Sequence, residues 1–150
     1  MKKVLPNDIL LGEVERLLRG GTSVTLKTKG NSMLPFIVGG RDCVLLVPYS
    51  CFPKVGDIAL ARLKNNIYVL HRIIFVGDDG TVVLMGDGNL RGTENCRVED
   101  LCGKVTDIIK NGRSVNPYSG CNVLFFRLWR KLLPFRRILL AVYRRLVIRL

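Results

Sequence analysis

Two spacings of hydrophobic side chains divide this chain into three parts. Between residues 7 and 19 they recur every three or four positions, the spacing that places one face of a helix against a core. The recurring side chains are Ile9, Leu10, Val14, Leu17 and Leu18. The pair Gly20–Gly21 follows them as a helix-ending signal. The first part, residues 1–21, is therefore predicted to contain one short amphipathic helix.

The middle part, residues 22–113, changes to a period of two, which is typical of β-strands. Side chains alternate in this way from Val24 towards Gly30, and further strand-like runs occupy residues 43–48, 57–63, 67–76, 81–85 and 103–110. Tight-turn sequences such as Asn111–Gly112 separate these runs. Short strands joined by tight turns, without long helices between them, predict one mainly β domain.

The last part begins with residues 114–122, which have the composition of a linker, and continues as a helical pattern over residues 123–150. At about 100° per residue, every Lys and Arg of this tail except Arg136 falls within an arc of roughly 140°. Hydrophobic side chains cluster broadly on the opposite side. Pro134 is expected to kink this basic amphipathic helix or to split it in two.

Charge is distributed unevenly along the 150 residues. The net charge is +12, of which residues 121–150 carry +8 without any Asp or Glu. A basic amphipathic helix that contains Trp129 and several phenylalanines is typical of a helix lying in an anionic lipid interface. A bilayer-spanning helix is disfavoured, because a Lys or Arg at the bilayer centre costs about 2.5–3.5 kcal/mol. The alternatives are a helix docked on the β domain and a nucleic-acid-binding arm, the second being weaker because the opposite face is so apolar.

The five cysteines lack the spacing of a metal site. Cys96 and Cys102 are too far apart for a zinc knuckle, so we expect no metal and no cofactor. An odd number of cysteines favours free thiols in a reducing compartment. Lys2–Lys3 resembles the start of a signal peptide, but Pro6 soon interrupts any apolar stretch. We therefore expect a cytoplasmic protein without an N-terminal anchor, able to lie on the inner face of the membrane through residues 123–150.

The candidate chemistry lies in a Gly-Asn-Ser-Met-Leu-Pro hexapeptide and in the chain's one histidine, His71. A serine becomes a nucleophile when a base is within hydrogen-bond reach and when donors stabilise the oxyanion that forms. Ser32 is the candidate nucleophile and His71 the candidate base. Gly30 permits a sharp turn, at which backbone N–H groups or the Asn31 amide are the available donors. Met33 is expected to anchor the turn.

A third segment, Gly86–Asn89, contains a carboxylate, Asp87, that could orient the histidine. Each fragment also has a plainer explanation. Ser32 could belong to an ordinary loop, His71 could be a half-buried strand residue, and Asp87 could bond its own turn. Their combination and order favour a serine peptidase.

Together the fragments resemble the clan of type I signal peptidases and LexA-like serine peptidases over roughly residues 22–110. The matching segments are Gly30–Ile37, Val55–Leu60, Val69–Ile74, Gly86–Asn89 and Asp100–Val105. The resemblance implies coiled antiparallel sheets and a peptide or protein substrate bound as an added β-strand, with small side chains near the scissile bond. Archaeal, sporulation-associated and endoplasmic-reticulum members carry a histidine where bacterial signal peptidases and LexA-type proteins carry a lysine. The resemblance therefore implies a Ser–His enzyme.

This resemblance assigns Ser32 as the nucleophile and His71 as general base and then general acid. Histidine-type members carry a second acidic residue about six positions after the aspartate of the Gly-Asp segment. Here that position is Thr93, with Glu94 next to it. The orienting acid is therefore Asp87 or Glu94, and we favour Asp87.

Two departures from the family pattern keep other functions open. Gly30 stands where bacterial forms have a serine that donates to the oxyanion, and true signal peptidases carry a membrane anchor that this sequence does not predict. The main alternative is thus a catalytically inactive relative that binds a peptide or a protein partner. A self-cleaving LexA-like regulator is weaker, because the residues before Val24 predict one helix, too little for a helix-turn-helix domain.

Overall fold

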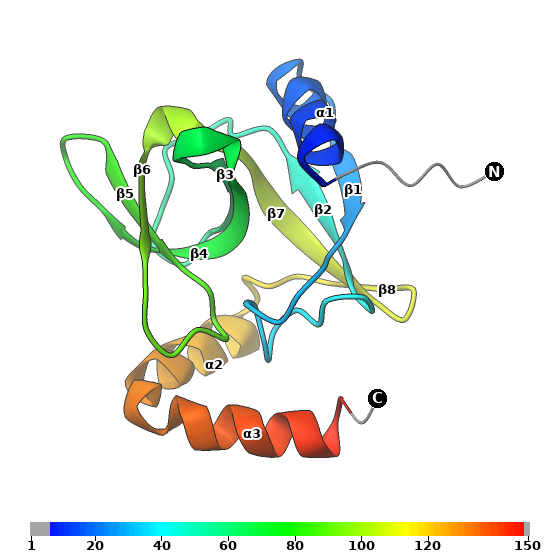
Figure 1. Cartoon of the computed structure of the whole chain (residues 1–150), viewed down its shortest axis with the longest axis vertical. Helices are drawn as coiled ribbons and strands as arrows, with labels where there is room; N and C mark the ends of the chain where they lie inside the picture. The colour runs from blue at the N-terminus through cyan, green and yellow to red at the C-terminus, as the bar shows by residue number, and fades with distance from the viewer. Residues whose placement is uncertain (1–6, 149–150) are drawn as a thin grey trace.

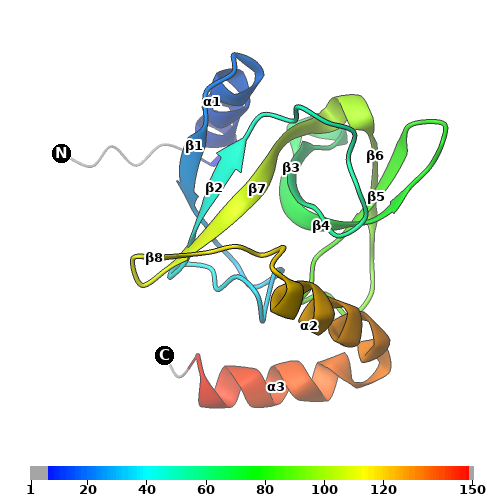
Figure 2. The ribbon, with the colours of Figure 1, turned by 180° about the vertical axis from the view of Figure 1, so that it is seen from behind.

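The computed structural model describes residues 7–148, which form one curled β-sheet with helices at both ends of the chain (Figures 1 and 2). The expectations for residues 1–6, including the lack of a signal peptide or anchor there, and for Arg149 lie outside the described residues. Helix α1 spans Asn7–Arg19, where the hydrophobic spacing predicted it. Its buried side chains Val14 and Leu18 pack into the main core.

Within residues 7–148, the sheet has eight strands in the order β1-β2-β7-β3-β4-β5-β6, with β8 paired to β7, and all the pairs are antiparallel. The strands are β1 Val24–Lys27, β2 Cys43–Val47, β3 Ile58–Arg62, β4 Tyr68–Val76, β5 Thr81–Met85, β6 Glu94–Arg97, β7 Leu101–Lys110 and β8 Arg113–Val115. Single turns of 3₁₀ helix occur at η1 Lys64–Asn66, η2 Val98–Asp100 and η3 Leu133–Phe135. The mainly β, antiparallel architecture predicted from the sequence is confirmed.

The sheet curls because several strands contain irregularities. The register of the pairs shifts at Leu45/Leu46, Leu60/Ala61 and Ile73/Phe75. An extra residue in one strand bends that strand and increases its local twist. The curled sheet encloses two hydrophobic clusters, one shared with α1 and containing Leu46 and Ile58, the other beneath β4 and β5 and containing Ile73 and Leu84.

Two short strands were not predicted. Strand β6 has the sequence Glu-Asn-Cys-Arg, in which Cys96 is the one buried residue, so it lacks a hydrophobic alternation. Strand β8 extends to Val115 and therefore takes the first two residues of the expected linker 114–122. Helix α2 begins at Gly120, so the connection between β8 and α2 is reduced to residues 116–119.

The C-terminal tail forms two helices, α2 Gly120–Lys131 and α3 Arg136–Leu146, separated at Pro134 as the sequence predicted. Both helices lie beneath the sheet in Figure 1. Trp129 of α2 and Leu140 of α3 are buried in a third hydrophobic cluster with Leu34 and Val38 of the β domain. The tail is therefore docked on the domain through one side of its helices, and contact of its other side with an anionic membrane stays a prediction.

Candidate active site

The segment that carries Ser32 is a long connection between β1 and β2 whose ends are tied together. Gly30 has a φ of +77°, and a Cβ on Gly39 would overlap the backbone of Gly30 where the two parts of the connection cross. The completely buried Asp42 accepts a hydrogen bond of 2.8 Å from the backbone N–H of Val38. These contacts lie within the connection itself, so they fix the turn without the help of a neighbouring strand.

A second backbone segment, Gly86–Asn89, holds the Ser32 turn from the other side. The N–H of Gly88 donates to the carbonyl oxygen of Ser32 over 2.8 Å. A Cβ on Gly88 would lie 2.5 Å from the carbonyl oxygen of Asn31, and a Cβ on Gly86 would overlap that of Ser32. The two glycines of the Gly-Asp-Gly sequence are therefore required for close backbone contact with the candidate nucleophile.

The aspartate between these glycines does not contact the histidine. Both carboxylate oxygens of Asp87 accept hydrogen bonds from Arg72, at 2.8 to 3.1 Å, and both residues are almost fully buried. The Arg72 guanidinium also lies against the rings of Phe36 and Phe126. Burial raises the pKa of Asp87 above its ordinary value, and the charge of Arg72 offsets part of that rise. The expectation that Asp87 orients His71 is thus corrected, because a buried arginine needs a full counter-charge.

The carboxylate beside the histidine is that of Glu94, which was the alternative acid. Its Oε2 lies 2.8 Å from Nδ1 of His71. Strand register explains the encounter, because Glu94 pairs with Leu84 of β5, which pairs with Ile73 of β4, and His71 is two residues from Ile73 on the same face. An ionised carboxylate only accepts hydrogen bonds, so Nδ1 carries the hydrogen and Nε2 of a neutral ring is left as the base.

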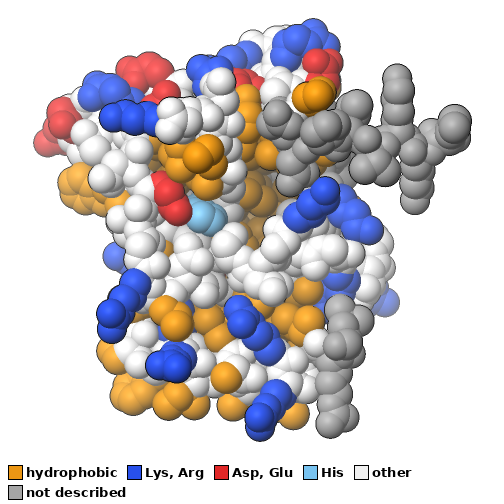
Figure 3. All heavy atoms as spheres, viewed as in Figure 1, with side chains coloured by type: hydrophobic (Ala, Val, Ile, Leu, Met, Phe, Trp, Pro, Cys, Tyr) orange, Lys and Arg blue, Asp and Glu red, His pale blue; other side chains and the backbone are white. Residues whose placement is uncertain are grey.

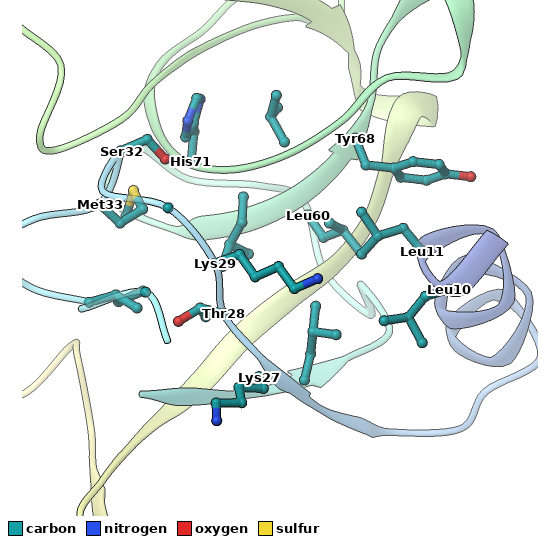
Figure 4. Close-up of a pocket in the computed structure, with 16 residues that line it drawn as sticks. Leu10, Leu11, Lys27, Thr28, Lys29, Ser32, Met33, Leu60, Tyr68 and His71 are labelled. Atoms are coloured by element: carbon teal, nitrogen blue, oxygen red, sulfur yellow. The ribbon is translucent and has the colours of Figure 1, made fainter. Parts of the chain in front are cut away.

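Ser32 and His71 meet at one end of a cavity of about 240 Å³. Figure 4 shows the Ser32 side chain beside the His71 ring, and Figure 3 shows the imidazole, in pale blue, at a hollow with an acidic side chain next to it. Among the described residues no hydrogen bond joins the Ser32 hydroxyl to the ring. Catalytic hydrogen bonds are often long before a substrate binds and tighten in the complex.

The turn also offers hydrogen-bond donors. Within residues 7–148, the backbone N–H groups of Asn31, Ser32 and Met33 donate to no other group. Met33 is buried in the main core, so it anchors the turn, whereas the Asn31 side chain is exposed. Together with Gly30, these residues form the segment from which the sequence predicted oxyanion donors.

The cavity continues from Ser32 towards α1 between two strands with unpaired edges. Its apolar lining includes Leu10 and Leu11 of α1, Leu26 of β1 and Leu60 of β3. Strand β1 pairs only with β2, and the β4–β5 pairing begins at Arg72, which leaves residues 68–71 of β4 with one open edge in the described sheet. An extended segment lying between these two edges could form backbone hydrogen bonds with either strand.

Helix α1 is held over the end of this cavity by a polar cluster. The Tyr68 hydroxyl donates to Glu15 over 2.5 Å, and Arg19 donates to the same carboxylate over 2.8 Å. Burial raises the pKa of Glu15, but these hydrogen bonds and the charge of Arg62 outweigh burial and hold the pKa below its ordinary value. Glu15 is therefore a charged anchor that fixes the leucines of α1 against the cavity.

Arg72 and Gly39 were not identified from the sequence. Arg72 had a recognisable signal, since a charged residue in the middle of an apolar strand requires a buried partner. Gly39 had no such signal in the sequence, because it is required only where the connection between β1 and β2 crosses itself at Gly30.

Other kinds of site are not found in the described part of the chain. No group of three or more His, Cys, Asp or Glu side chains between residues 7 and 148 could hold a metal ion. None of the helices in this range combines the length and hydrophobicity needed to cross a bilayer. A comparison with profiles of known protein families finds no match, and a comparison with curated protein sequences also finds none.

Proposed function

We propose that this protein is a serine endopeptidase related to the histidine-type signal peptidases and LexA-like peptidases. The observation that carries the proposal is the 2.8 Å contact between His71 Nδ1 and Glu94, with Ser32 at the same end of the cavity. Glu94 lies one residue from the position at which histidine-type members carry their acidic residue. The assignment depends on the geometry of the site and on the sequence segments that resemble the clan.

In this mechanism Ser32 Oγ attacks the carbonyl carbon of the scissile peptide bond while Nε2 of His71 takes the hydroxyl proton. Glu94 holds the ring in the required tautomer and stabilises the imidazolium that forms. The N–H groups of the turn at Asn31–Met33 stabilise the oxyanion of the tetrahedral intermediate. His71 then protonates the leaving amine, and a water molecule, activated by the same ring, hydrolyses the acyl-enzyme.

The substrate class is an extended peptide. The open edges of β1 and of residues 68–71 of β4 would bind its backbone, and the apolar cavity would take one of its aliphatic side chains. For the same enzyme we propose a cytoplasmic site of action, supported by the exposed free thiols of Cys51 and Cys121, which suit a reducing compartment.

Acylation of Ser32 tests the chemistry without knowledge of the natural peptide. A serine-acylating β-lactone probe is expected to label the protein at one serine, identified by mass spectrometry, and labelling should disappear in Ser32→Ala. Ser50→Ala is the matched control, because Ser50 is exposed and distant in sequence from the site. A peptide library digested by the wild-type protein and analysed by mass spectrometry would then define the cleavage preference.

The second candidate is a peptide-binding module that does not cleave. It is favoured by the lack of a direct Ser32–His71 hydrogen bond among the described residues. Peptide binding that is equal in the wild type and Ser32→Ala, with no probe labelling and no cleavage in either, would establish this function and exclude the peptidase.

A further inference from the structure

The helices α2 and α3 leave an unusually hydrophobic surface uncovered. Sixteen large hydrophobic side chains are exposed in the described part of the chain, and ten of them lie between residues 124 and 147. The ten are Leu124, Phe125, Leu128, Leu133, Phe135, Ile138, Leu139, Val142, Leu146 and Val147. An apolar concentration of this kind on one small element indicates a contact surface. We call it the outer face of the α2–α3 pair.

On α3 the outer face consists of a hydrophobic strip and a basic strip, both turned away from the β domain. Leu140 and the aliphatic part of Arg136 point to the β domain and are 4% exposed. Ile138, at 65% exposure, and Val142, at 49%, continue the hydrophobic arc beyond what the domain covers. At 100° per residue, a basic strip of Arg137, Arg144 and Arg145 lies directly beside that arc.

Helix α2 and the 3₁₀ turn η3 also carry hydrophobic side chains beside basic ones. One surface hollow is lined by Leu124 and Leu128 together with basic side chains of the same helix, Arg127, Arg130 and Lys131. A second hollow joins Leu133 and Pro134 to Arg91 and Arg137. Apolar side chains and cations are therefore interleaved on this surface, as Figure 3 shows for the lower layer of the molecule, where orange and blue side chains alternate.

In the part of the chain that the structure describes, the exposed cations of the outer face have no acidic partner. Residues 121–150 contain no Asp or Glu, and among residues 7–148 no ion pair involves the exposed Arg127, Lys131, Arg137, Arg144 or Arg145. Unpaired cations attract an anionic surface. A nucleic acid would match these charges but would leave the leucines and phenylalanines unburied, whereas an anionic bilayer offers both phosphates and a hydrocarbon boundary.

We propose that the outer face of the α2–α3 pair docks on an anionic lipid bilayer, with both helices lying in the interface. The hydrophobic strip enters the boundary between headgroups and acyl chains, and the basic strip contacts the lipid phosphates. The helices form the layer beneath the sheet in Figure 1, and the His71 hollow lies above that layer in Figure 3, so the candidate active site stays in water near the membrane surface.

Vesicle co-sedimentation of the full chain tests this proposal. The wild-type protein is expected to sediment with phosphatidylglycerol-containing vesicles and to remain in solution with pure phosphatidylcholine. Arg144→Gln combined with Arg145→Gln should weaken binding by roughly 30-fold, which corresponds to about 1 kcal/mol per basic side chain at an anionic surface. Ile138→Ser combined with Val142→Ser should weaken it by about tenfold or more, because two buried aliphatic groups are lost.

Matched controls remove the same chemistry from elsewhere on the surface. Lys64→Gln with Arg113→Gln removes two exposed charges, and Phe52→Ser with Phe75→Ser removes two exposed hydrophobic side chains. Both controls should bind as the wild type does. Unchanged circular dichroism and thermal unfolding of all variants would exclude loss of the fold as the cause.

Four outcomes would overturn the proposal. Equal sedimentation with both vesicle types, or equal losses in the controls, would show that this face is not an anionic lipid surface. Binding of duplex DNA that falls with the arginine variant but not with the Ile138 and Val142 variant would make it a nucleic-acid interface. A dimer seen by analytical ultracentrifugation and abolished by that second variant would assign the face to a second copy of the chain.

Discussion

Replacement of Glu94 by glutamine separates the two carboxylates that the sequence left as alternatives. The substitution keeps the size of the side chain but removes its charge, and it allows an amide N–H₂ group to face His71 Nδ1 in place of an oxygen that only accepts. If the amide donates to Nδ1, the ring hydrogen moves to Nε2, and the ring can no longer take a proton from Ser32. We expect a large loss of reactivity without a large loss of stability.

The structure sets the size of this loss. A hydrogen bond to a charged group contributes about 1.5–3 kcal/mol, which corresponds to a decrease of roughly 10- to 150-fold in rate. An Asp-to-Asn exchange in a fully buried serine protease triad costs about 10⁴-fold because the tautomer is wrong. The Glu94 side chain is 25% exposed, so water replaces part of its effect, and we expect a decrease of about 10²- to 10³-fold.

The assay is the rate of Ser32 acylation by the β-lactone probe, measured beside thermal unfolding. Asp87→Asn is the matched variant, since it makes the same chemical change in the carboxylate that binds Arg72. That pair is buried, and removal of one partner from a buried ion pair costs about 3–5 kcal/mol of unfolding free energy. Glu94→Gln should therefore mainly lower the acylation rate, and Asp87→Asn should mainly lower the melting temperature.

The reverse result would refute the assignment. If Asp87→Asn lowered the acylation rate with an unchanged melting temperature while Glu94→Gln reacted as the wild type, the orienting acid would be Asp87. Glu94→Asp provides a further check, because it retains the charge and should recover part of the rate lost in Glu94→Gln.

Three more predictions follow from the packing around the site. Gly88→Ala should lower both the melting temperature and the acylation rate, because a Cβ there would lie 2.5 Å from the Asn31 carbonyl oxygen, whereas Gly120→Ala, with no atom within 4 Å of its Cβ, should change neither. Leu140→Ala should cost about 2–5 kcal/mol in denaturant unfolding, whereas Ile138→Ala on the outer face should cost less than about 1 kcal/mol. Burial raises the pKa of Asp42. Hydrogen bonds from Arg41 and Val38 and the charge of Lys110 outweigh burial and hold this pKa below the ordinary value of 3.8. A lowered pKa in the folded state stabilises the fold above the ordinary pKa, so stability should fall as the pH drops below about 4. Asp42→Asn should reduce that dependence, measured by urea titrations at different pH.

The sequence predicted the strands whose stabilisation is local and periodic. Residues 67–76 were expected to form a strand, and Tyr68–Val76 do so as β4, whose hydrophobic side chains pack into both hydrophobic clusters of the sheet. Strand β6 was missed because its pairing depends on β5 lying beside it, and its own four residues carry little hydrophobic pattern. The position of Glu94 follows from that pairing, so the wrong choice of Asp87 and the missed strand have one cause.

The tail shows a similar division between local pattern and tertiary contact. Arg136 was the one basic residue outside the predicted charged arc, and within residues 123–148 it is the one buried basic side chain, donating to the carbonyl oxygen of Asn89 over 2.9 Å. Its position outside the arc is consistent with its burial. It did not indicate that the β domain lies on that side of the helix, because the partner residues Leu34 and Val38 come from a loop without a periodic pattern.

Trp129 connects helix α2 to the segment that holds the Ser32 turn, so completion of the site depends on a helix that is made after the strands. Its indole N–H donates to the carbonyl oxygen of Asp87 over 2.7 Å, and Phe126 covers the guanidinium of Arg72. The Gly88 N–H beside that aspartate holds the carbonyl of Ser32. All eight strands of the described sheet leave the ribosome before α2 does, so a nascent chain has Ser32 and His71 before Phe126 covers the ion pair of Arg72 and Asp87. The two helices that follow the sheet in the chain complete the support of the site, so the proposed peptidase is not fully assembled until α2 and α3 have been made.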